Sequence, residues 1–151
     1  MIKIPDFSKK KLNNLAPDCI VLNQIFSYAD IEGVADLISW KIVFFKKKRT
    51  GIISAICFQE IFDDDIIKIS NSILKKLNID IKFGETIKDI SMYLGNSYFV
   101  DKIYYNMIRY GALLSSSVFV SIGLTEGKVS YFEVVTDKEI IDNIISARNS
   151  N

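Results

Sequence analysis

The chain of 151 residues carries 19 basic and 18 acidic side chains, a net charge of +1, and it contains no histidine. This length fits a single domain with one full core. The charge balance argues against nucleic acid as the main ligand, because phosphate binding favours a strongly basic face. The missing histidine excludes the Ser-His-Asp and Cys-His catalytic arrangements and the ordinary zinc sites.

The N-terminal residues are mostly polar and contain both prolines of the chain, Pro5 and Pro17. We expect residues 1–18 to form an irregular polar arm, with the lysines at 9–11 in solvent. Residues 19–28 are apolar, and so short a run is compatible with a strand or with the start of a helix.

Residues 30–39 are predicted to form a helix. Their apolar side chains recur at helical spacing, which is typical of one buried helical face, although Gly33 lowers the helix propensity. The members of this face are Ile31, Val34, Ala35 and Ile38.

Two apolar runs, 40–45 and 52–58, are rich in aromatic and β-branched residues and indicate a β-hairpin. The basic stretch 46–49 lies between them. Lysines at a hairpin tip protect a sheet edge from pairing with other chains, and the same cluster could contact phosphate locally.

Three consecutive carboxylates, Asp63, Asp64 and Asp65, follow the hairpin. They precede a predicted helix whose apolar face consists of Ile66, Ile69, Ile73 and Leu77. An aspartate accepts hydrogen bonds from the free amides of a first helical turn, and negative charge there favours the helix dipole. The helix therefore accounts for one or two of these carboxylates and leaves a surplus.

A connector or short strand is expected at 78–83, and a second helix is expected within 84–95. Thr86 and Asp89 fit the pattern of a capping box, and Gly95 provides a left-handed stop.

The C-terminal third is predicted to be mainly β, with a hairpin loop at 125–127. Its three expected strands are 98–110, 114–124 and 128–135. Asp137 is expected to cap a final helix, and the tail 148–151 is expected to fray. These elements predict one α+β domain over 1–151, in which an antiparallel sheet, made of a hairpin and a C-terminal meander, packs against several helices.

The sequence also predicts a compartment. Every apolar run is shorter than the roughly 18 residues that span a bilayer, and the first residues lack the apolar core of a secretory signal. Cys19 and Cys57 both have apolar neighbours and are expected to be buried, reduced thiols. We therefore expect a cytoplasmic protein without a membrane partner.

Neither metal binding nor catalysis has a motif. The run at 63–65 lacks the alternating oxygen ligands and the glycine of a calcium loop, and a magnesium site built from Glu60 and Asp63 would have no known pattern. The glycines form no nucleotide-binding pattern. Cys57 has no adjacent cation to activate it as a nucleophile. We predict no catalytic residue, no metal and no cofactor, and hence no enzyme.

Tyrosines gather in the C-terminal strands, at Tyr98, Tyr104, Tyr105, Tyr110 and Tyr131. Because side chains of a strand alternate between faces, some belong to the core and the others could form an aromatic interface for a protein. A platform for stacking bases would need adjacent cations, and only Lys102, Arg109 and Lys128 qualify.

The stretch Gly-Glu-Thr-Ile-Lys-Asp-Ile-Ser-Met-Tyr-Leu-Gly at 84–95 and the strands that end at 123–134, with their Gly-Lys-Val hairpin, resemble a recurring module. This module is similar to the repeat of β-lactamase-inhibitor and outer-membrane-assembly lipoproteins, and such modules occur in small bacterial immunity proteins. Asn96 and Ser97 stand where the module often has a proline.

The whole chain resembles the immunity proteins of contact-dependent growth inhibition and related polymorphic toxin systems. The shared features are the length, the single α+β domain, the richness in Ile, Lys and Asn, and the absence of a catalytic signature. The resemblance implies that the protein binds a cognate toxin C-terminal domain, often a nuclease, and blocks its active site without contacting nucleic acid directly.

Carboxylates that imitate phosphates could meet the basic cleft of such a toxin, with an aromatic side chain adding affinity. The candidate toxin-binding residues are Glu60, Phe62, Asp63, Asp64 and Asp65. Two alternatives remain: these residues are only a solvated loop and helix cap, and the protein is a small ligand-binding or scaffold domain without catalysis.

Overall fold

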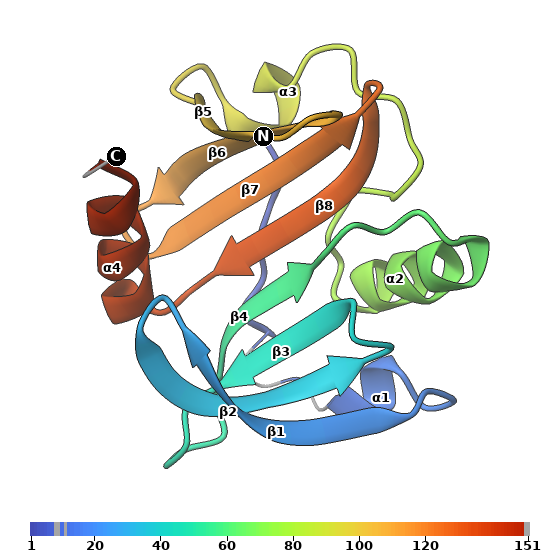
Figure 1. The fold of residues 1–151 in the computed structure, drawn as a ribbon, viewed down its shortest axis with the longest axis vertical. Helices are drawn as coiled ribbons and strands as arrows, with labels where there is room; N and C mark the ends of the chain where they lie inside the picture. Colours follow the sequence, from blue (N-terminus) through green and yellow to red (C-terminus); the bar gives the residue numbers. More distant parts are fainter. Residues whose placement is uncertain (8–9, 11, 150–151) are drawn as a thin grey trace.

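The computed structural model describes residues 1–7, 10 and 12–149. Within them the chain forms four helices and one eight-stranded antiparallel sheet, which confirms the predicted α+β class (Figure 1). None of the helices in this part of the chain is long and apolar enough to span a bilayer.

The elements follow one another as α1 (Leu12–Leu15), β1 (Val21–Tyr28), β2 (Ile31–Ile38), β3 (Ile42–Lys46), β4 (Ile53–Phe58), α2 (Asp64–Lys76), α3 (Ser91–Leu94), β5 (Phe99–Ile103), β6 (Met107–Ser115), β7 (Val118–Thr125), β8 (Lys128–Val135) and α4 (Lys138–Asn149). The strand order in the sheet is β1-β2-β3-β4-β8-β7-β6-β5. The sheet therefore consists of two four-stranded meanders, each followed by a helix, and the pairing of β4 with β8 joins them.

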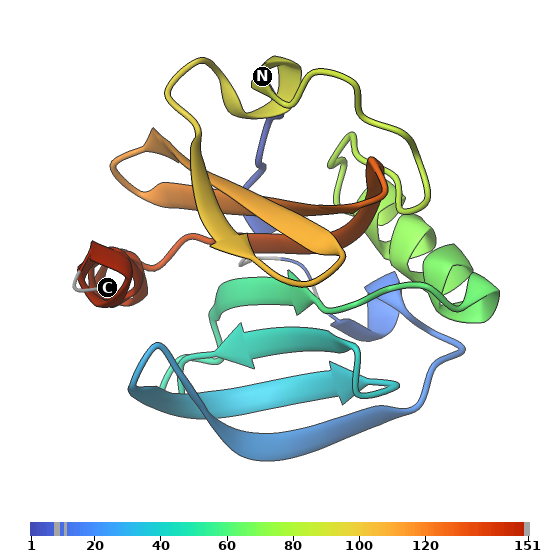
Figure 2. The same ribbon diagram turned by 45° about the horizontal axis from the view of Figure 1, so that its top comes forward.

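Both faces of the central strands are buried. Phe44, Ile56 and Phe132 point into one apolar cluster, which includes the inner side of α2. Their neighbours Phe45 and Cys57 point into a second cluster, which includes α4. Figure 2 shows α2 and α4 at opposite ends of the molecule. Burial on both faces explains why the central strands are continuously apolar and do not alternate.

The predicted helix at 30–39 is wrong, because this segment is the strand β2. Ala29 and Asp30 have φ angles of 50° and 64°, and this tight left-handed turn lays β2 back along β1. Gly33 belongs to the strand because the ring of Phe45 covers it, and an added Cβ would lie 2.4 Å from Phe45 Cζ. The helical spacing of the apolar residues arose because the second half of β2 is buried on both faces.

The helix expected within 84–95 is shorter than predicted and begins only at Ser91. Thr86 forms a β-bridge with Lys128 and so cannot cap a helix. Asp89 accepts hydrogen bonds from the amide and hydroxyl of Ser91, at 3.0 and 2.6 Å. Gly95 ends the helix at the predicted position, but its φ of 77° and ψ of 178° are not those of the predicted left-handed cap.

The single strand expected at 98–110 is two strands, β5 and β6, joined by a turn at residues 104–106. The amide of Tyr104 donates to the carbonyl of Met107 at 2.8 Å and closes this turn. The turn contains neither glycine nor proline, and Asn106 alone is a weak signal for it.

Side chains of the N-terminal residues enter the core. The buried ones are Ile2, Phe7, Leu15 and Ala16. Lys10 is exposed, whereas the expectations for Lys9 and Lys11 fall outside the described residues. The amide of Ile2 donates to the carbonyl of Tyr93 at 2.9 Å, which joins the start of the chain to α3.

Candidate functional site

The acidic run divides into a structural part and an exposed part. Asp63 is the N-cap of α2, and its Oδ1 accepts from the amides of Asp65 and Ile66 at 2.9 and 3.4 Å. The side chains of Asp64 and Asp65 are exposed, and neither makes an ion pair or a hydrogen bond with any described residue. The helix uses one carboxylate directly, so two carboxylates remain free in solvent.

Phe62 and Glu60 lie immediately before this helix. The amide of Ile61 donates to the carbonyl of Ser130 at 2.8 Å, and the buried Ile61 side chain holds the segment against β8. Phe62 consequently points outward and is 54% exposed. Glu60, with a φ of 47°, is also exposed, and its carboxylate lies 3.7 Å from the ammonium group of Lys41.

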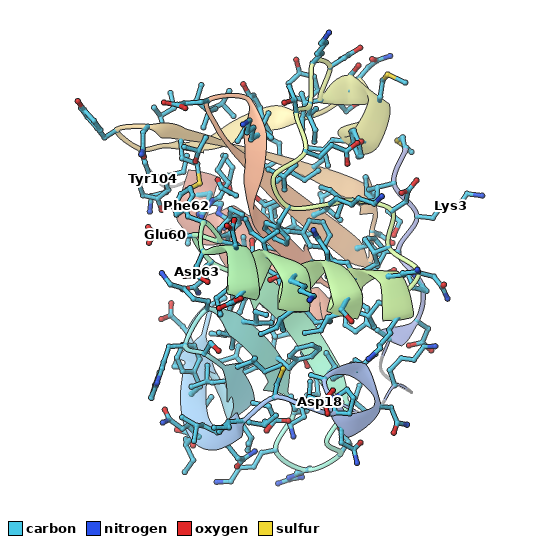
Figure 3. All side chains as sticks on the ribbon, turned by 90° about the vertical axis from the view of Figure 1, so that its right-hand side faces the viewer. Lys3, Asp18, Glu60, Phe62, Asp63 and Tyr104 are labelled. Carbon is cyan, nitrogen blue, oxygen red and sulfur yellow. The ribbon has the colours of Figure 1, made fainter. Side chains whose placement is uncertain are left out.

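The structure thus places all five predicted site residues together at the start of α2. We call Glu60, Phe62, Asp63, Asp64 and Asp65 the acidic segment. Figure 3 shows its labelled members along one side of the molecule, and Tyr104 lies beside them. Tyr104 comes from the turn between β5 and β6, so it reaches the acidic segment from a distant part of the sequence.

A pocket of about 310 Å³ connects the acidic segment with that turn. Its lining residues are Gln59, Glu60, Tyr104, Met107, Arg109 and Tyr131. We call it the Arg109 pocket. Sequence reasoning did not assemble this pocket, because its walls come from three separate stretches that only the sheet order brings together.

Arg109 is the principal charged group of the pocket and is held on two sides. Its guanidinium carbon lies 4.5 Å from the ring centroid of Tyr131 and 5.7 Å from that of Tyr104, which gives two cation–π contacts. Its Nε lies 3.2 Å from Oδ2 of Asp101. Gly123 leaves room for this arrangement, because an added Cβ would lie 2.6 Å from Cβ of Tyr131.

Arg109 is held in place by a buried network of charged side chains. The Nε of Arg148 lies 2.9 Å from Oδ1 of Asp101, and its Nη2 lies 3.5 Å from Oε1 of Glu133. The hydroxyl of Tyr28 donates to the other oxygen of Glu133. The predicted fraying of the tail is therefore wrong at Arg148, since this side chain is held by two buried carboxylates, whereas residues 150–151 fall outside the described part.

Burial alters the acidity of two groups in this network. Desolvation raises the pKa of Glu133 to about 6, although the nearby Arg148 lowers it. Desolvation also raises the pKa of Cys57, whose thiol donates to the hydroxyl of Tyr131 at 3.4 Å. A thiol with a raised pKa is a poor nucleophile at neutral pH, which agrees with the prediction that Cys57 is a buried structural residue.

The tyrosines divide between core and surface. Tyr131 is buried, whereas Tyr105 is fully exposed at the tip of the turn. Tyr98 and Tyr110 pack edge to face at 5.8 Å between their ring centroids. Apolar side chains of β5, including Val100 and Ile103, are also exposed beside them. An aromatic and apolar surface therefore lies on the other face of the β5–β6 pair from Arg109, because Tyr110 follows Arg109 directly in β6 and pairs with Val100.

Within the described residues, no group of three or more carboxylate or cysteine side chains is arranged to hold a metal ion. No protein-family model matches the chain, and neither a curated protein nor a solved structure matches it.

Proposed function

We propose that the protein is a non-enzymatic immunity protein that binds a toxin domain and neutralises it by covering its active site. The toxin domain that we favour is a nuclease. The proposal rests on the acidic segment and on the resemblance of the whole chain to immunity proteins of polymorphic toxin systems.

One observation carries the proposal. Asp64 and Asp65 are exposed and have no side-chain partner among the described residues, and the largely exposed ring of Phe62 lies directly beside them. An aromatic side chain is the kind of group that provides most of the affinity of an interface when a partner covers it. The surrounding carboxylates would speed the encounter with a basic cleft and select it over other surfaces.

Neighbouring aromatic side chains extend this interface. Stable protein complexes bury about 800 Å² on each partner, which is more than the acidic segment alone can supply. The side chain of Tyr104, which is 41% exposed, lies beside the labelled members of the acidic segment and could enlarge the contact, together with Tyr105, its exposed neighbour in the chain. A mixture of aromatic centre and charged border is common in specific interfaces.

The first test is co-purification with the product of the gene that lies beside its own, and protection of cells that express this product. The second test is the double substitution of Asp64 and Asp65 by Asn. Asp63 is left unchanged because it caps α2. We expect association to slow by roughly tenfold at low ionic strength and its dependence on salt to flatten.

A matched control replaces two other exposed carboxylates, Asp18 and Asp30, which lie outside the acidic segment, by Asn. Figure 3 shows Asp18 well away from the labelled residues of the acidic segment. Both double variants change the net charge equally, so a purely global charge effect would slow both alike. Equal slowing, or unchanged kinetics in the Asp64 and Asp65 variant, would place the interface elsewhere. Failure of the protein to bind or protect against the toxin would overturn the immunity proposal.

A further inference from the structure

We propose that the Arg109 pocket is a binding site for a single carboxylate of a partner polypeptide, which Arg109 receives through its two terminal nitrogens. This site shares Glu60 with the acidic segment but differs from it in chemistry, because its principal ligand-binding group is a guanidinium and not a carboxylate. It does not depend on the identity of the partner as a toxin.

The guanidinium is already oriented without a ligand. Asp101, to which its Nε is bound, has a fully buried side chain. The position of Asp101 is in turn set by Arg148 at 2.9 Å and by the hydroxyl of Ser121 at 3.3 Å. A group that is held in its binding geometry in advance loses little conformational freedom when a ligand arrives.

The two terminal nitrogens of Arg109 are the unused part of this side chain. Only Nε–H donates a hydrogen bond to a described residue, although a guanidinium has five donors. The side chain is only 12% exposed, yet its terminal nitrogens are not sealed from solvent, so a ligand can reach them. A carboxylate that accepted from both terminal nitrogens would form the planar bidentate pair that arginine favours.

The rings of Tyr131 and Tyr104 restrict how a ligand can approach. Both lie within cation–π distance of the guanidinium and, together with Met107, they line the same pocket. The guanidinium carbon lies over the face of the Tyr131 ring, so this ring closes one side of the group and a ligand must approach from another side. A planar carboxylate is the acceptor that matches the two terminal nitrogens of a guanidinium.

The size and charge of the pocket favour a carboxylate over a phosphate. About 310 Å³ is at the lower end of the range of ligand sites, which is enough for an acidic side chain or a chain terminus. Asp101 already balances the one arginine, and Glu60 also lines the pocket. Lys102 lies 5.5 Å from the ring of Tyr104 but is not a lining residue. A doubly charged phosphate would meet too little positive charge here.

The direct test follows the Nε–H resonance of Arg109 in ¹⁵N-labelled full-length protein by NMR. The probes are acetyl-Gly-Glu-Gly-amide, which has a side-chain carboxylate, and acetyl-Gly-Gly-Gly with a free C-terminus. Their controls are acetyl-Gly-Gln-Gly-amide and acetyl-Gly-Gly-Gly-amide. We expect a saturable shift, with a Kd of about 1 mM, from at least one carboxylate probe and from neither amide. The carboxylate probe that binds more tightly shows whether the pocket prefers an acidic side chain or a chain terminus.

Two variants assign the binding to this pocket. Arg109→Lys keeps the positive charge but loses the two parallel donors of the guanidinium, so we expect about tenfold weaker binding. Binding to this variant is followed through the backbone amide shifts of the lining residues. Tyr104→Leu removes one ring without touching the buried charges, and we expect severalfold weaker binding. Tyr105→Leu is the matched control, because Tyr105 lies in the same turn but not in this pocket, and its binding should be unchanged.

Three results would overturn the proposal: no saturable shift with either carboxylate, tighter binding of inorganic phosphate than of both peptides, or unchanged binding in both the Arg109 and Tyr104 variants. Each is independent of toxin binding, so failure here leaves the immunity proposal in place. Loss of toxin protection would likewise leave the peptide result in place.

Discussion

Glu133 shows how a single buried carboxylate sets a pH dependence. Its side chain is almost inaccessible, yet it contacts both the guanidinium of Arg148 and the hydroxyl of Tyr28. The hydroxyl donates more strongly to a carboxylate than to a neutral acid, so the hydroxyl and the arginine both favour the carboxylate, whereas desolvation favours the neutral acid. Desolvation is the larger effect, and the pKa is about 6 against an ordinary value of 4.5.

The folded state therefore binds a proton at Glu133 more tightly than the unfolded state. The stabilisation from this proton is fully present below pH 4.5 and is lost as the pH rises through 6. A shift of this size corresponds to about 2 kcal/mol of unfolding free energy. We expect the Glu133→Gln variant not to lose this stabilisation as the pH rises, and therefore to be more stable than the wild type at pH 7.

The measurement is urea unfolding of both proteins between pH 4 and pH 8. The difference between the two free energies of unfolding isolates Glu133, because all other titrating groups are shared. A difference that stays constant across this range would contradict the raised pKa.

The acidic segment illustrates which single residues a sequence can assign. Asp63 was predictable as a cap because a cap acts on amides two and three positions away. Asp137 is a second example, since its Oδ1 accepts from the amide of Ile140 at 3.1 Å. Arg148 was not predictable, because its partners Asp101 and Glu133 are distant in sequence and become neighbours only when the sheet forms.

At the scale of elements, β2 depends on a glycine that faces an aromatic ring. An added Cβ at Gly33 would lie 2.4 Å from Cζ of Phe45 and 2.6 Å from the carbonyl oxygen of Lys46. Neither the backbone nor the buried ring can move without disturbing β3. We expect Gly33→Ala to lower the free energy of unfolding by about 1–3 kcal/mol.

Thermal unfolding of Gly33→Ala, Phe45→Leu and the double variant would measure this contact. If the ring is the obstacle, the cost of Gly33→Ala should fall in the background of Phe45→Leu, since leucine occupies less of the space above the glycine. Strictly additive costs would show that the ring does not restrict position 33.

The elements that sequence patterns predicted correctly are those whose determinants are local. The helix α2 has its own cap and apolar face, and the loop between β7 and β8 has Glu126 and Gly127 at φ angles of 52° and 79°. Two of the elements predicted wrongly are decided by a distant partner. Thr86 pairs with Lys128 across the sheet, and β2 is a strand because two sheet neighbours surround it.

At the scale of the whole molecule, Arg148 ties the last helix, α4, to three strands of the sheet. It extends from α4 to Asp101 on β5 and Glu133 on β8, and its guanidinium carbon lies 5.0 Å from the ring centroid of Phe119 on β7. Removing one partner from a buried ion network leaves the remaining charges uncompensated, which costs about 3–5 kcal/mol. We expect Arg148→Ala to lose stability on this scale at pH 7.

The loss should be smaller at pH 5, because Glu133 is then mostly protonated and no longer needs a cation. Denaturant unfolding at both pH values measures this. Arg49→Ala, which removes an exposed arginine of the β3–β4 hairpin tip, is the control and should change little at either pH. A loss for Arg148→Ala that is equal at both values would exclude coupling to Glu133.

One of the two parts of the candidate site, the acidic segment, could be predicted from the sequence, whereas the Arg109 pocket could not. The acidic segment is continuous in the sequence, and it carries more carboxylates than a helix cap requires, so the residues alone were enough to single it out. The Arg109 pocket combines residues that follow β4 with residues of β6, of β8 and of the turn between β5 and β6, so it exists only because β4 pairs with β8. Strand order within a sheet depends on long-range pairing, which residue patterns in one sequence do not encode.

The pairing of β4 with β8 also determines what occupancy of this pocket would do to the protein itself. Gln59 and Glu60 extend from the first meander, whereas Tyr104, Arg109 and Tyr131 belong to the second. A molecule bound between them would contact both meanders across the β4–β8 pairing, which is the only strand pairing that joins the two meanders in the described chain. It would stabilise this pairing against local unfolding. A bound partner would therefore also protect the protein from proteases and lengthen its lifetime in the cell.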